Sequence, residues 1–357
     1  MATNTDIPQG YKATALGIIP QEWEVKTLGN IAEINPSKGK ITSKVVTFLA
    51  MSDISEQGGV INENILPIDS IKPGLTPFRK GDVIIAKITP CFENGKGALL
   101  DKITEDDGFG STEFHVIRCQ QDNKFVYYHT QSYAFRKRLE SQMTGSAGQK
   151  RVPADSVAAY KIAVPPLAEQ RKIAEVLGVW DEAIEKQARL IEKLALRKRA
   201  LMQRLLSAKL RLPGFSEPWK KVKLGDVAEL YQPQTIQSED LSQTGYPVYG
   251  ANGLIGYYNN YNHEYPQVVI TCRGSSCGTV NFTPGKCWIT GNAMVLNVDN
   301  NRDVNKSFFY YLISNSSFVN LISGSGQPQI VRQPLLKFEL RIPPLKEQTA
   351  IAEVLTA

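Results

Sequence analysis

Apolar residues follow two different patterns along the chain. Between residues 23 and 164, short runs rich in β-branched and aromatic residues alternate with glycine, proline and asparagine turn signals. Runs of this kind are typical of β-strands, and we predict strands at 45–51, 83–88 and 113–118. Apolar residues in 125–140 recur at helical spacing instead, which predicts one amphipathic helix. This part of the chain is therefore expected to form a β-rich domain.

The pattern changes at Pro165-Pro166. From Leu167 to about Ser207 there is no proline, and Gly178 is the only glycine. Apolar residues recur there at heptad spacing, which predicts a helix about 60 Å long. Two apolar positions in each heptad form a narrow stripe, or seam, that one partner helix can cover, so we expect a coiled-coil spacer. A long helix lying on its own domain is the alternative. The predicted interface residues are Ile173, Leu177, Trp180, Ile184, Ile191, Leu194, Leu201 and Leu205.

Most of this pattern occurs twice. Segments 22–34, 165–170 and 173–177 recur as 218–230, 343–348 and 351–355. The copies are 196 residues apart at Trp23 and Trp219 but 178 apart at Pro165 and Pro343, so the second is shorter by 18 residues. Constant ends around a divergent middle predict two modules with one architecture and different surfaces.

In the second module the sequence pattern predicts strands at 268–272 and 294–298 and a helix at 308–322. A second spacer helix should begin after Pro343-Pro344 and, by the 178-residue shift, end about 28 residues beyond Ala357. We therefore predict an α+β chain: two β-rich domains in tandem, a long coiled-coil spacer helix between them, and a truncated second spacer helix. The expected domains are 1–165, 166–211, 212–343 and 344–357.

Composition narrows the function only slightly. The net charge of +6 and pI of about 8.9 permit a polyanionic partner without requiring one. The N-terminus has no signal-peptide core, and no apolar run approaches membrane-helix length, so a soluble cytoplasmic protein is expected. Five irregularly spaced cysteines argue against a disulfide framework. Without a Cys-x-x-Cys pair they also favour small buried residues over a metal site, so no metal ligand is predicted.

Motifs typical of catalytic sites are absent from the sequence or incomplete. No phosphate-binding Walker loop or dinucleotide-binding glycine motif occurs. Asn35-Pro36-Ser37 resembles the start of an amino-methyltransferase motif but lacks its aromatic residue. The three histidines have no neighbouring serine or cysteine arrangement that indicates a triad. These observations favour binding over catalysis, while a self-sufficient nuclease or methyltransferase and a peptide- or glycan-binding interaction protein remain alternatives.

Polar loops recur at matching places in the two modules. Small residues let a backbone approach phosphates closely, and Gln and Arg carry the paired groups that read adenine and guanine edges. Two such surfaces on a spacer suit a bipartite site in double-stranded DNA. For any single residue an ordinary turn is the alternative. The candidate DNA-contacting residues are Lys87, Lys96, Gln142, Thr144, Ser146, Gln149, Lys150 and Arg151, then Tyr249, Asn252, Arg273, Ser275, Ser323, Ser325, Gln327 and Arg332.

Ordered motifs along essentially the whole chain carry a family resemblance. They are Ile19-Pro20-x-x-Trp23 with Leu28-Gly29, Gly110-Ser111-Thr112-Glu113-Phe114-His115-Val116, Pro165-Pro166-Leu167-x-Glu169-Gln170, Tyr249-Gly250-Ala251-Asn252-Gly253 with Gly256-Tyr257, and Cys272-Arg273-Gly274-Ser275-x-Cys277-Gly278. With these motifs the sequence resembles the specificity (S) subunit of type I restriction–modification systems.

The resemblance implies a non-catalytic recognition subunit with two target-recognition domains and an antiparallel coiled coil. It implies two docked methyltransferase (modification) subunits and further restriction/translocase subunits. S-adenosylmethionine, ATP and Mg would belong to those partners, and this chain would hold no cofactor. The early end at Ala357 departs from the family pattern and leaves the first helix without most of its partner. We therefore expect either that this unpaired helix pairs with the helix of another copy or that the sequence is a shortened version of a longer protein.

Overall fold

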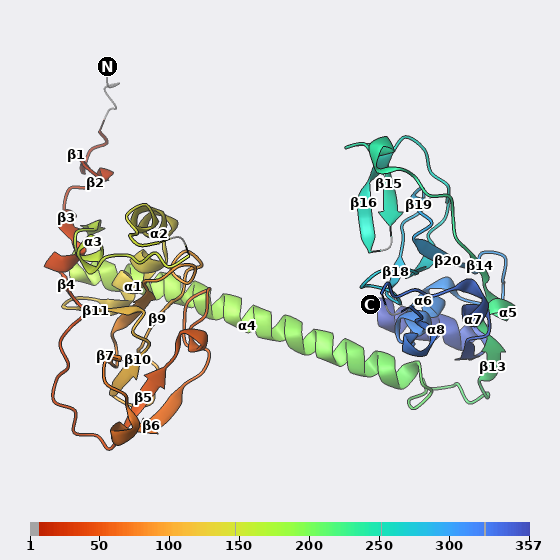
Figure 1. Ribbon diagram of the computed structural model, residues 1–357, viewed down its shortest axis with the longest axis horizontal. Coiled ribbons are helices and arrows are strands. Elements are labelled where there is room, and N and C mark those ends of the chain that lie inside the picture. Colours follow the sequence, from red (N-terminus) through yellow and green to blue (C-terminus); the bar gives the residue numbers. More distant parts are fainter. Residues whose placement is uncertain (1–6, 147, 251, 325) are drawn as a thin grey trace. The chain divides into compact units, whose positions relative to one another are not determined.

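One topology appears twice in this chain. A computed structural model describes residues 7–146, 148–250, 252–324 and 326–357. It separates into unit 1, Met1–Gln187, and unit 2, Ala188–Ala357 (Figure 1). The boundary falls inside helix α4, Leu167–Leu205, so each unit contains part of that helix. The division into four domains stays a prediction.

Unit 1 is built on two four-stranded sheets, ordered β6-β5-β10-β7 and β4-β11-β8-β9. Their strands are β4 (Ala32–Ile34), β5 (Val45–Leu49), β6 (Asn64–Pro67), β7 (Thr76–Arg79), β8 (Val83–Ala86), β9 (Gly97–Leu99), β10 (Asp107–Gly110) and β11 (Phe114–Cys119). The strands predicted at 45–51, 83–88 and 113–118 are confirmed as β5, β8 and β11. Every residue of β8 is buried, which explains its unbroken apolar sequence.

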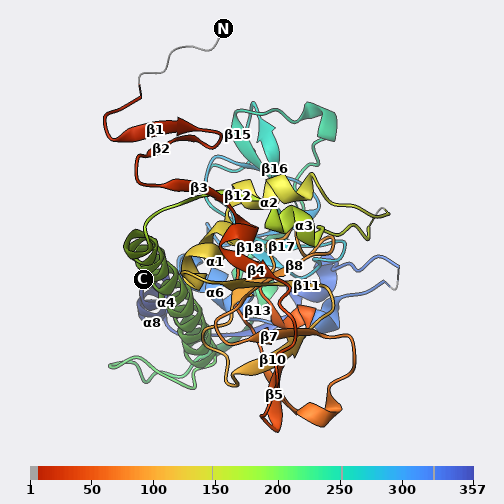
Figure 2. The ribbon, with the colours of Figure 1, turned by 90° about the vertical axis from the view of Figure 1, so that its left-hand side faces the viewer.

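Two smaller strand pairs complete unit 1. The segment that precedes the first module contains a hairpin of β1 (Tyr11–Thr14) and β2 (Gly17–Pro20). Strand β3 (Glu24–Thr27) pairs antiparallel with β12 (Lys161–Val164), as Figure 2 shows. This second pair brings the two constant ends of the first module together.

The single helix predicted at 125–140 is wrong. Two helices occupy this segment, α1 (Asn123–Gln131) and α2 (Tyr133–Glu140). Ser132 between them has extended backbone angles, and its hydroxyl accepts a hydrogen bond from the backbone N–H of Phe135. A serine that caps the following helix ends the preceding one, although the apolar spacing continues across it.

Unit 2 repeats this plan with a smaller second sheet. Sheet β14-β20-β17-β18 matches β4-β11-β8-β9 strand for strand, and β16-β15-β19 matches β6-β5-β10. Among the described residues of unit 2, no strand corresponds to β7. The strands are β13 (Lys220–Lys223), β14 (Glu229–Tyr231), β15 (Tyr246–Gly250), β16 (Gly253–Tyr258), β17 (Val268–Thr271), β18 (Val280–Phe282), β19 (Trp288–Ile289), β20 (Ala293–Asn297) and β21 (Glu339–Ile342).

The helix predicted at 308–322 is only partly correct, because α6 spans Lys306–Ser314 and a separate 3₁₀ turn follows. The strands predicted at 268–272 and 294–298 are confirmed as β17 and β20, and α8 (Leu345–Thr356) begins after the second Pro-Pro pair. The remaining short helices are α3 (Ala154–Ala158), α5 (Leu224–Val227) and α7 (Arg332–Leu336), with 3₁₀ turns at Leu28–Asn30, Met51–Asp53, Ile68–Ser70, Ser238–Asp240 and Val319–Leu321.

The predicted seam of α4 has buried ends and an exposed middle. Ile173 packs against the core of unit 1, and Leu201 packs against the core of unit 2. An unpaired seam would leave both Leu201 and Leu205 exposed, and this expectation is wrong, because Leu205 is fully buried in that second core and Leu201 is half-buried. The C-terminal end of α4 packs against the core of unit 2, and Leu205 contacts that core instead of another helix. The exposed seam residues are Leu177, Trp180, Ile184, Ile191 and Leu194, and their helix partner stays a prediction.

The recurring Pro-Pro-Leu-x-Glu-Gln motif fixes the start of the long helices. The side-chain amide of Gln170 donates a hydrogen bond of 2.8 Å to the carbonyl oxygen of Pro165. Gln348 donates in the same way to Pro343 at 2.9 Å. Each glutamine therefore satisfies a buried carbonyl in the turn that launches its helix. This contact explains why proline and glutamine recur together.

The glutamate of the same motif has different partners in the two units. In unit 1, Glu169 accepts a hydrogen bond of 3.0 Å from the indole N–H of Trp23. In unit 2, the guanidinium of Arg211 donates to both carboxylate oxygens of Glu347, at 2.6 and 2.8 Å. Within the described part of unit 2, the indole N–H of Trp219 is buried without a hydrogen-bond partner. In unit 2, Arg211 therefore pairs with the carboxylate that corresponds to the hydrogen-bond acceptor of Trp23 in unit 1.

Candidate nucleic-acid interface

Loop 144–152 of unit 1 closes on itself and lies along the end of β8. Thr144 and Arg151 exchange two backbone hydrogen bonds of 3.0 and 2.8 Å. The backbone N–H of Val152 donates to the carbonyl oxygen of Lys87 at 2.8 Å. The structure therefore brings Lys87 next to a loop that is 57 or more residues away in sequence.

Loop 323–330 of unit 2 has the same backbone pairing. Ser323 and Gln329 exchange two backbone hydrogen bonds of 2.9 and 2.8 Å. The N–H of Ile330 donates to the carbonyl oxygen of Cys272, which follows β17, at 2.9 Å. The expected recurrence of this polar loop at corresponding positions is thus present in the backbone hydrogen bonds.

This pairing identifies equivalent positions whose side chains differ. Arg151 of unit 1 corresponds to Gln329 of unit 2. Glu113 corresponds to Asn292, because their carbonyl oxygens accept the N–H groups of Lys87 and Cys272, at 2.9 and 3.1 Å. One unit therefore has a guanidinium and a carboxylate where the other has two amides. These groups differ in the hydrogen bonds that they offer to a base edge.

Glu113 and Arg151 form an ion pair beside the loop. The Nε and Nη2 atoms of Arg151 lie 3.0 and 2.8 Å from the two carboxylate oxygens of Glu113. Hydrogen bonds from Arg151 lower the pKa of Glu113 below its ordinary value of 4.5, although partial burial opposes this shift. Because 38 residues separate the two partners, the sequence alone does not reveal this pair.

Replacing Arg151 with methionine is expected to raise the pKa of Glu113. The wild-type pair stabilises the fold above the ordinary glutamate pKa, and this contribution is lost as pH falls through the lowered value. An NMR titration of the Glu113 carboxyl carbon measures the shift. Lys150→Gln removes an exposed neighbouring charge and is the control. An unchanged Glu113 titration in Arg151→Met would contradict the assignment of the pair.

Other predicted contacts of unit 1 lie around the same loop with two exceptions. Gln142 precedes the loop and is half-buried. Lys96 is held elsewhere, because its ammonium donates to the carbonyl oxygen of Met51 at 2.9 Å. The exposed loop residues that stay available are Thr144, Ser146, Gln149 and Lys150.

In unit 2 the structure brings together four of the eight predicted contacts. Arg273 forms a β-bridge with Gln329, and the next residue, Gly274, donates its N–H to Pro328. Arg273, Ser275, Ser323 and Gln327 are exposed around this junction, and Arg332 is exposed at the start of α7. Tyr249 and Asn252 belong to the β15–β16 hairpin, where Tyr249 accepts from Thr290. Ser325 lies outside the described residues.

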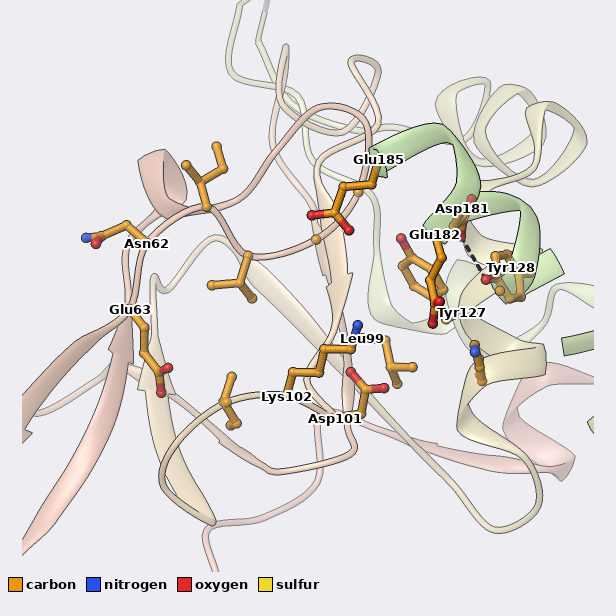
Figure 3. Close-up of a pocket in the computed structure, with 17 residues that line it drawn as sticks. Asn62, Glu63, Leu99, Asp101, Lys102, Tyr127, Tyr128, Asp181, Glu182 and Glu185 are labelled. Carbon is orange, nitrogen blue, oxygen red and sulfur yellow. Dashed lines mark hydrogen bonds between the residues drawn. The ribbon is translucent and has the colours of Figure 1, made fainter. Parts of the chain in front are cut away.

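A groove of about 520 Å³ in unit 1 has the wrong charge for nucleic acid (Figure 3). It lies between α1, α4 and two loops at 58–63 and 99–103. Lys102 and Lys124 oppose a larger number of carboxylates in its lining. A net negative lining repels phosphates, so we exclude the groove from the candidate interface. Its carboxylates are those of Glu63, Asp101, Asp181, Glu182 and Glu185.

The described residues contain no His, Cys, Asp and Glu grouping that could hold a metal ion. Cys272 and Cys287 are buried, as the sequence predicts, whereas the other three cysteines are only half-buried. Burial raises the pKa of the Cys272 thiol to about 11. No helix in the described ranges is long and apolar enough to span a membrane.

Comparison with known proteins gives a consistent family. The model of the type I restriction modification DNA specificity domain matches residues 20–195 and 216–357. The EcoAI specificity subunit of Escherichia coli is 42% identical over 160 residues, which cover 43% of this chain and only 27% of that relative. A putative MjaX specificity subunit of Methanocaldococcus jannaschii is 24% identical over 387 residues, covering 98% of this chain and 89% of that protein.

A solved structure has a similar fold. The S subunit of a type I restriction–modification system from M. genitalium superposes with a TM-score of 0.63 at 18% identity. The superposition covers 94% of this chain and 88% of that one. At this identity the likeness concerns the fold, and it agrees with the predicted α+β chain of two tandem domains and a long helix.

Proposed function

Because the chain belongs to the family of type I restriction modification DNA specificity domains and contains two matching regions, we propose that it recognises a bipartite DNA target. Each unit reads one half of the target, and the two halves are separated by a fixed gap. The chain serves as the specificity subunit of a type I restriction–modification complex. Loop 144–152 and loop 323–330, with the strand ends beside them, supply the DNA contacts.

The observation that carries this proposal is the pair of equivalent loops with unequal side chains. The same type of backbone hydrogen-bond pairing presents Arg151 and Glu113 in unit 1 but Gln329 and Asn292 in unit 2. Once Arg151 leaves Glu113, its guanidinium fork matches the major-groove edge of guanine, and side-chain amides match that of adenine. Recognition of two different half-sites requires this arrangement: the two units share a backbone pairing and differ in the side chains that contact the bases.

The chain acts without catalytic groups of its own. Two modification subunits bring S-adenosylmethionine, and restriction subunits bring the ATP- and Mg-dependent cleavage. The exposed seam of α4, from Leu177 to Leu194, provides an apolar surface on which another helix packs as a coiled coil. Purified chain incubated with DNA, Mg and S-adenosylmethionine should therefore show no turnover; sustained methylation or cleavage would favour the enzyme alternative.

Selection from random duplexes tests the bipartite target. The chain, assembled with its modification subunits, should enrich two short motifs separated by a constant gap. Enrichment of one continuous motif would contradict the proposal.

Exchanging the equivalent residues sharpens this experiment. Glu113→Asn with Arg151→Gln should alter only the first motif, and Asn292→Glu with Gln329→Arg only the second. Each lost base contact should weaken the original target by about 1–3 kcal/mol. The two double variants serve as controls for each other. If both motifs change together, or neither changes, these residues do not read bases.

A further inference from the structure

The loop between β4 and β5 differs in charge from its counterpart. Loop 35–44 contains Lys38, Lys40 and Lys44 and no acidic residue. All three lysines are exposed, and none forms a salt bridge with a described residue. The equivalent loop of unit 2, 232–245, has no lysine or arginine but contains acidic residues at 239 and 240. The two units therefore present opposite charge at one topological position.

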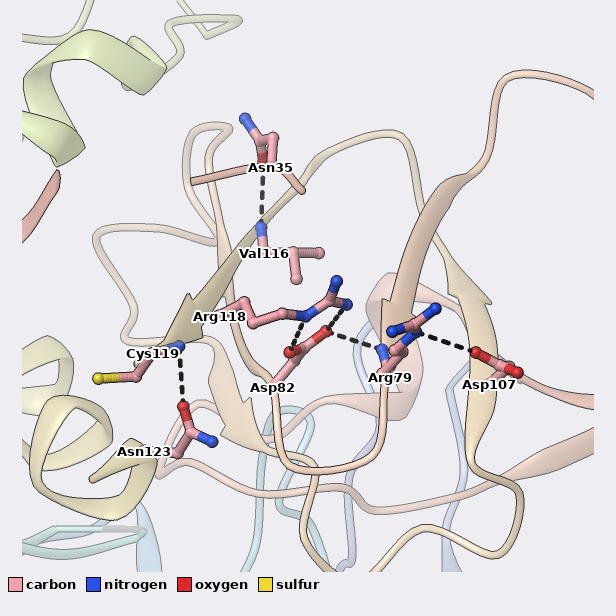
Figure 4. A network of polar contacts seen from close by, with 8 residues as sticks. All are labelled: Asn35, Arg79, Asp82, Asp107, Val116, Arg118, Cys119 and Asn123. Carbon is pink, nitrogen blue, oxygen red and sulfur yellow. Dashed lines mark hydrogen bonds and ion pairs between the residues drawn. The ribbon is translucent and has the colours of Figure 1, made fainter. Parts of the chain in front are cut away.

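Both ends of loop 35–44 are fixed to the sheets of unit 1. The backbone N–H of Asn35 donates to Val116 at 2.7 Å, and its side-chain oxygen accepts from the Val116 N–H at 3.1 Å (Figure 4). Asn35 has a φ of 54°, a left-handed conformation that asparagine tolerates better than most residues. At the other end, the carbonyl of Lys44 accepts from the N–H of Ile68 at 2.9 Å.

The middle of the loop lies on strands β10 and β7. The ammonium of Lys38 is 4.9 Å from the centroid of the Phe109 ring on β10. Gly39 lies against the guanidinium of Arg79 at the end of β7. Arg79 itself pairs with Asp107 at 3.4 Å, as Figure 4 shows. The lysines are therefore presented from a seated loop, which reduces the entropy lost on binding.

The strand that supports this loop has no counterpart in the described part of unit 2. Strand β7 has no counterpart there, since the matching sheet has three strands. The basic loop and the strand that supports it thus occur together in unit 1. A row of lysines on a solvated loop needs no ligand by itself. The combination of a fixed backbone, unpaired ammonium groups and a dedicated supporting strand does point to a binding surface.

We propose that loop 35–44 binds the phosphate backbone of the duplex and that unit 1 alone carries such an element. This inference rests on the DNA-binding function proposed above. Lysine ammonium groups are point charges that attract phosphate without distinguishing bases. Unit 1 then supplies sequence-independent affinity, whereas unit 2 depends more on base contacts. The acidic groove shares no lining residue with this loop and keeps the duplex off the α4 side of unit 1.

Salt dependence of binding tests the proposal. In the full chain assembled with its modification subunits, Lys38, Lys40 and Lys44 are changed together to glutamine. Affinity for the target duplex and for an unrelated duplex is measured across a range of salt concentrations. Each lost phosphate contact lowers the slope of log affinity against log salt by roughly 0.9, so the slope should fall by up to about 3. Both duplexes should lose affinity by the same factor.

A matched control removes equal charge elsewhere. Lys220, Lys221 and Lys223 on β13 are exposed, and changing all three to glutamine should leave the slope unchanged. The proposal is overturned by an unchanged slope in the loop variant, by an equal loss in the control, or by a loss confined to the target duplex. If the parent complex binds neither duplex at any salt concentration, the proposed DNA-binding function fails instead.

Discussion

Replacing Arg211 with alanine is expected to lower the free energy of unfolding of unit 2 by about 3–5 kcal/mol. The side chain of Glu347 is only 1% exposed, and Arg211 occupies both of its oxygens. Alanine would leave a buried carboxylate without its counter-charge, which is far more costly than losing an exposed pair. The change in unfolding free energy is measured by denaturant unfolding, with amide hydrogen exchange in α8 as the probe.

Two further variants separate this effect from a general loss of charge. Lys221→Ala breaks a pair with Glu339 in which both side chains are more than half exposed, and it should cost at most about 1 kcal/mol. Arg211→Met combined with Glu347→Leu removes both buried charges and should recover most of the stability. Equal stability of Arg211→Ala and Lys221→Ala would show that Glu347 is not dependent on Arg211.

Replacing Arg136 with alanine is expected to cost about 3 kcal/mol or more in the stability of unit 1. This guanidinium is buried without a carboxylate and donates to the carbonyl oxygens of Thr130, Phe92 and Gly95 at 2.8, 3.1 and 3.1 Å. Each buried acceptor left without a donor costs about 1–3 kcal/mol. Burial lowers the pKa of Arg136 to about 10, so it stays charged at neutral pH.

Arg136 also fixes the turn between β8 and β9, beside the candidate interface. The Arg136→Ala variant should therefore bind the duplex more weakly than the wild type does, although Arg136 lies outside loop 144–152. Arg138→Ala, two residues further on at an exposed position of α2, is the control and should change stability by less than about 0.5 kcal/mol. Thermal unfolding and duplex affinity of the two variants are compared. A stable Arg136→Ala protein would contradict the role assigned to these three hydrogen bonds.

Local patterns and the repeat predict much of this fold. The unbroken apolar run of β8 and the heptad spacing of α4 can both be recognised from neighbouring residues, without knowledge of distant contacts. The break at Ser132 could not be predicted in this way, because a single capping hydrogen bond decides it. Leu205 also fits the seam pattern, and only the folded unit determines that it joins a core instead.

The candidate interface is harder to predict, because its geometry depends on pairing between distant segments. The sequence indicates two polar loops, and Arg332 is the basic residue predicted for the second. Backbone pairing shows that Gln329 is the residue in the place of Arg151. The 178-residue shift between Arg151 and Gln329 equals the shift at Pro165 and Pro343, and that equality was the available signal.

The strand pairs that join the ends of each module have a consequence for inheritance. Strand β3 pairs with β12 in unit 1, and β13 pairs with β21 in unit 2, so each module enters and leaves through one two-stranded ribbon. Everything between can change in length, as the 18-residue difference illustrates, without moving the points of entry and exit. Recombination between genes at these ribbons would exchange a whole recognition surface in one event and leave the remaining protein intact.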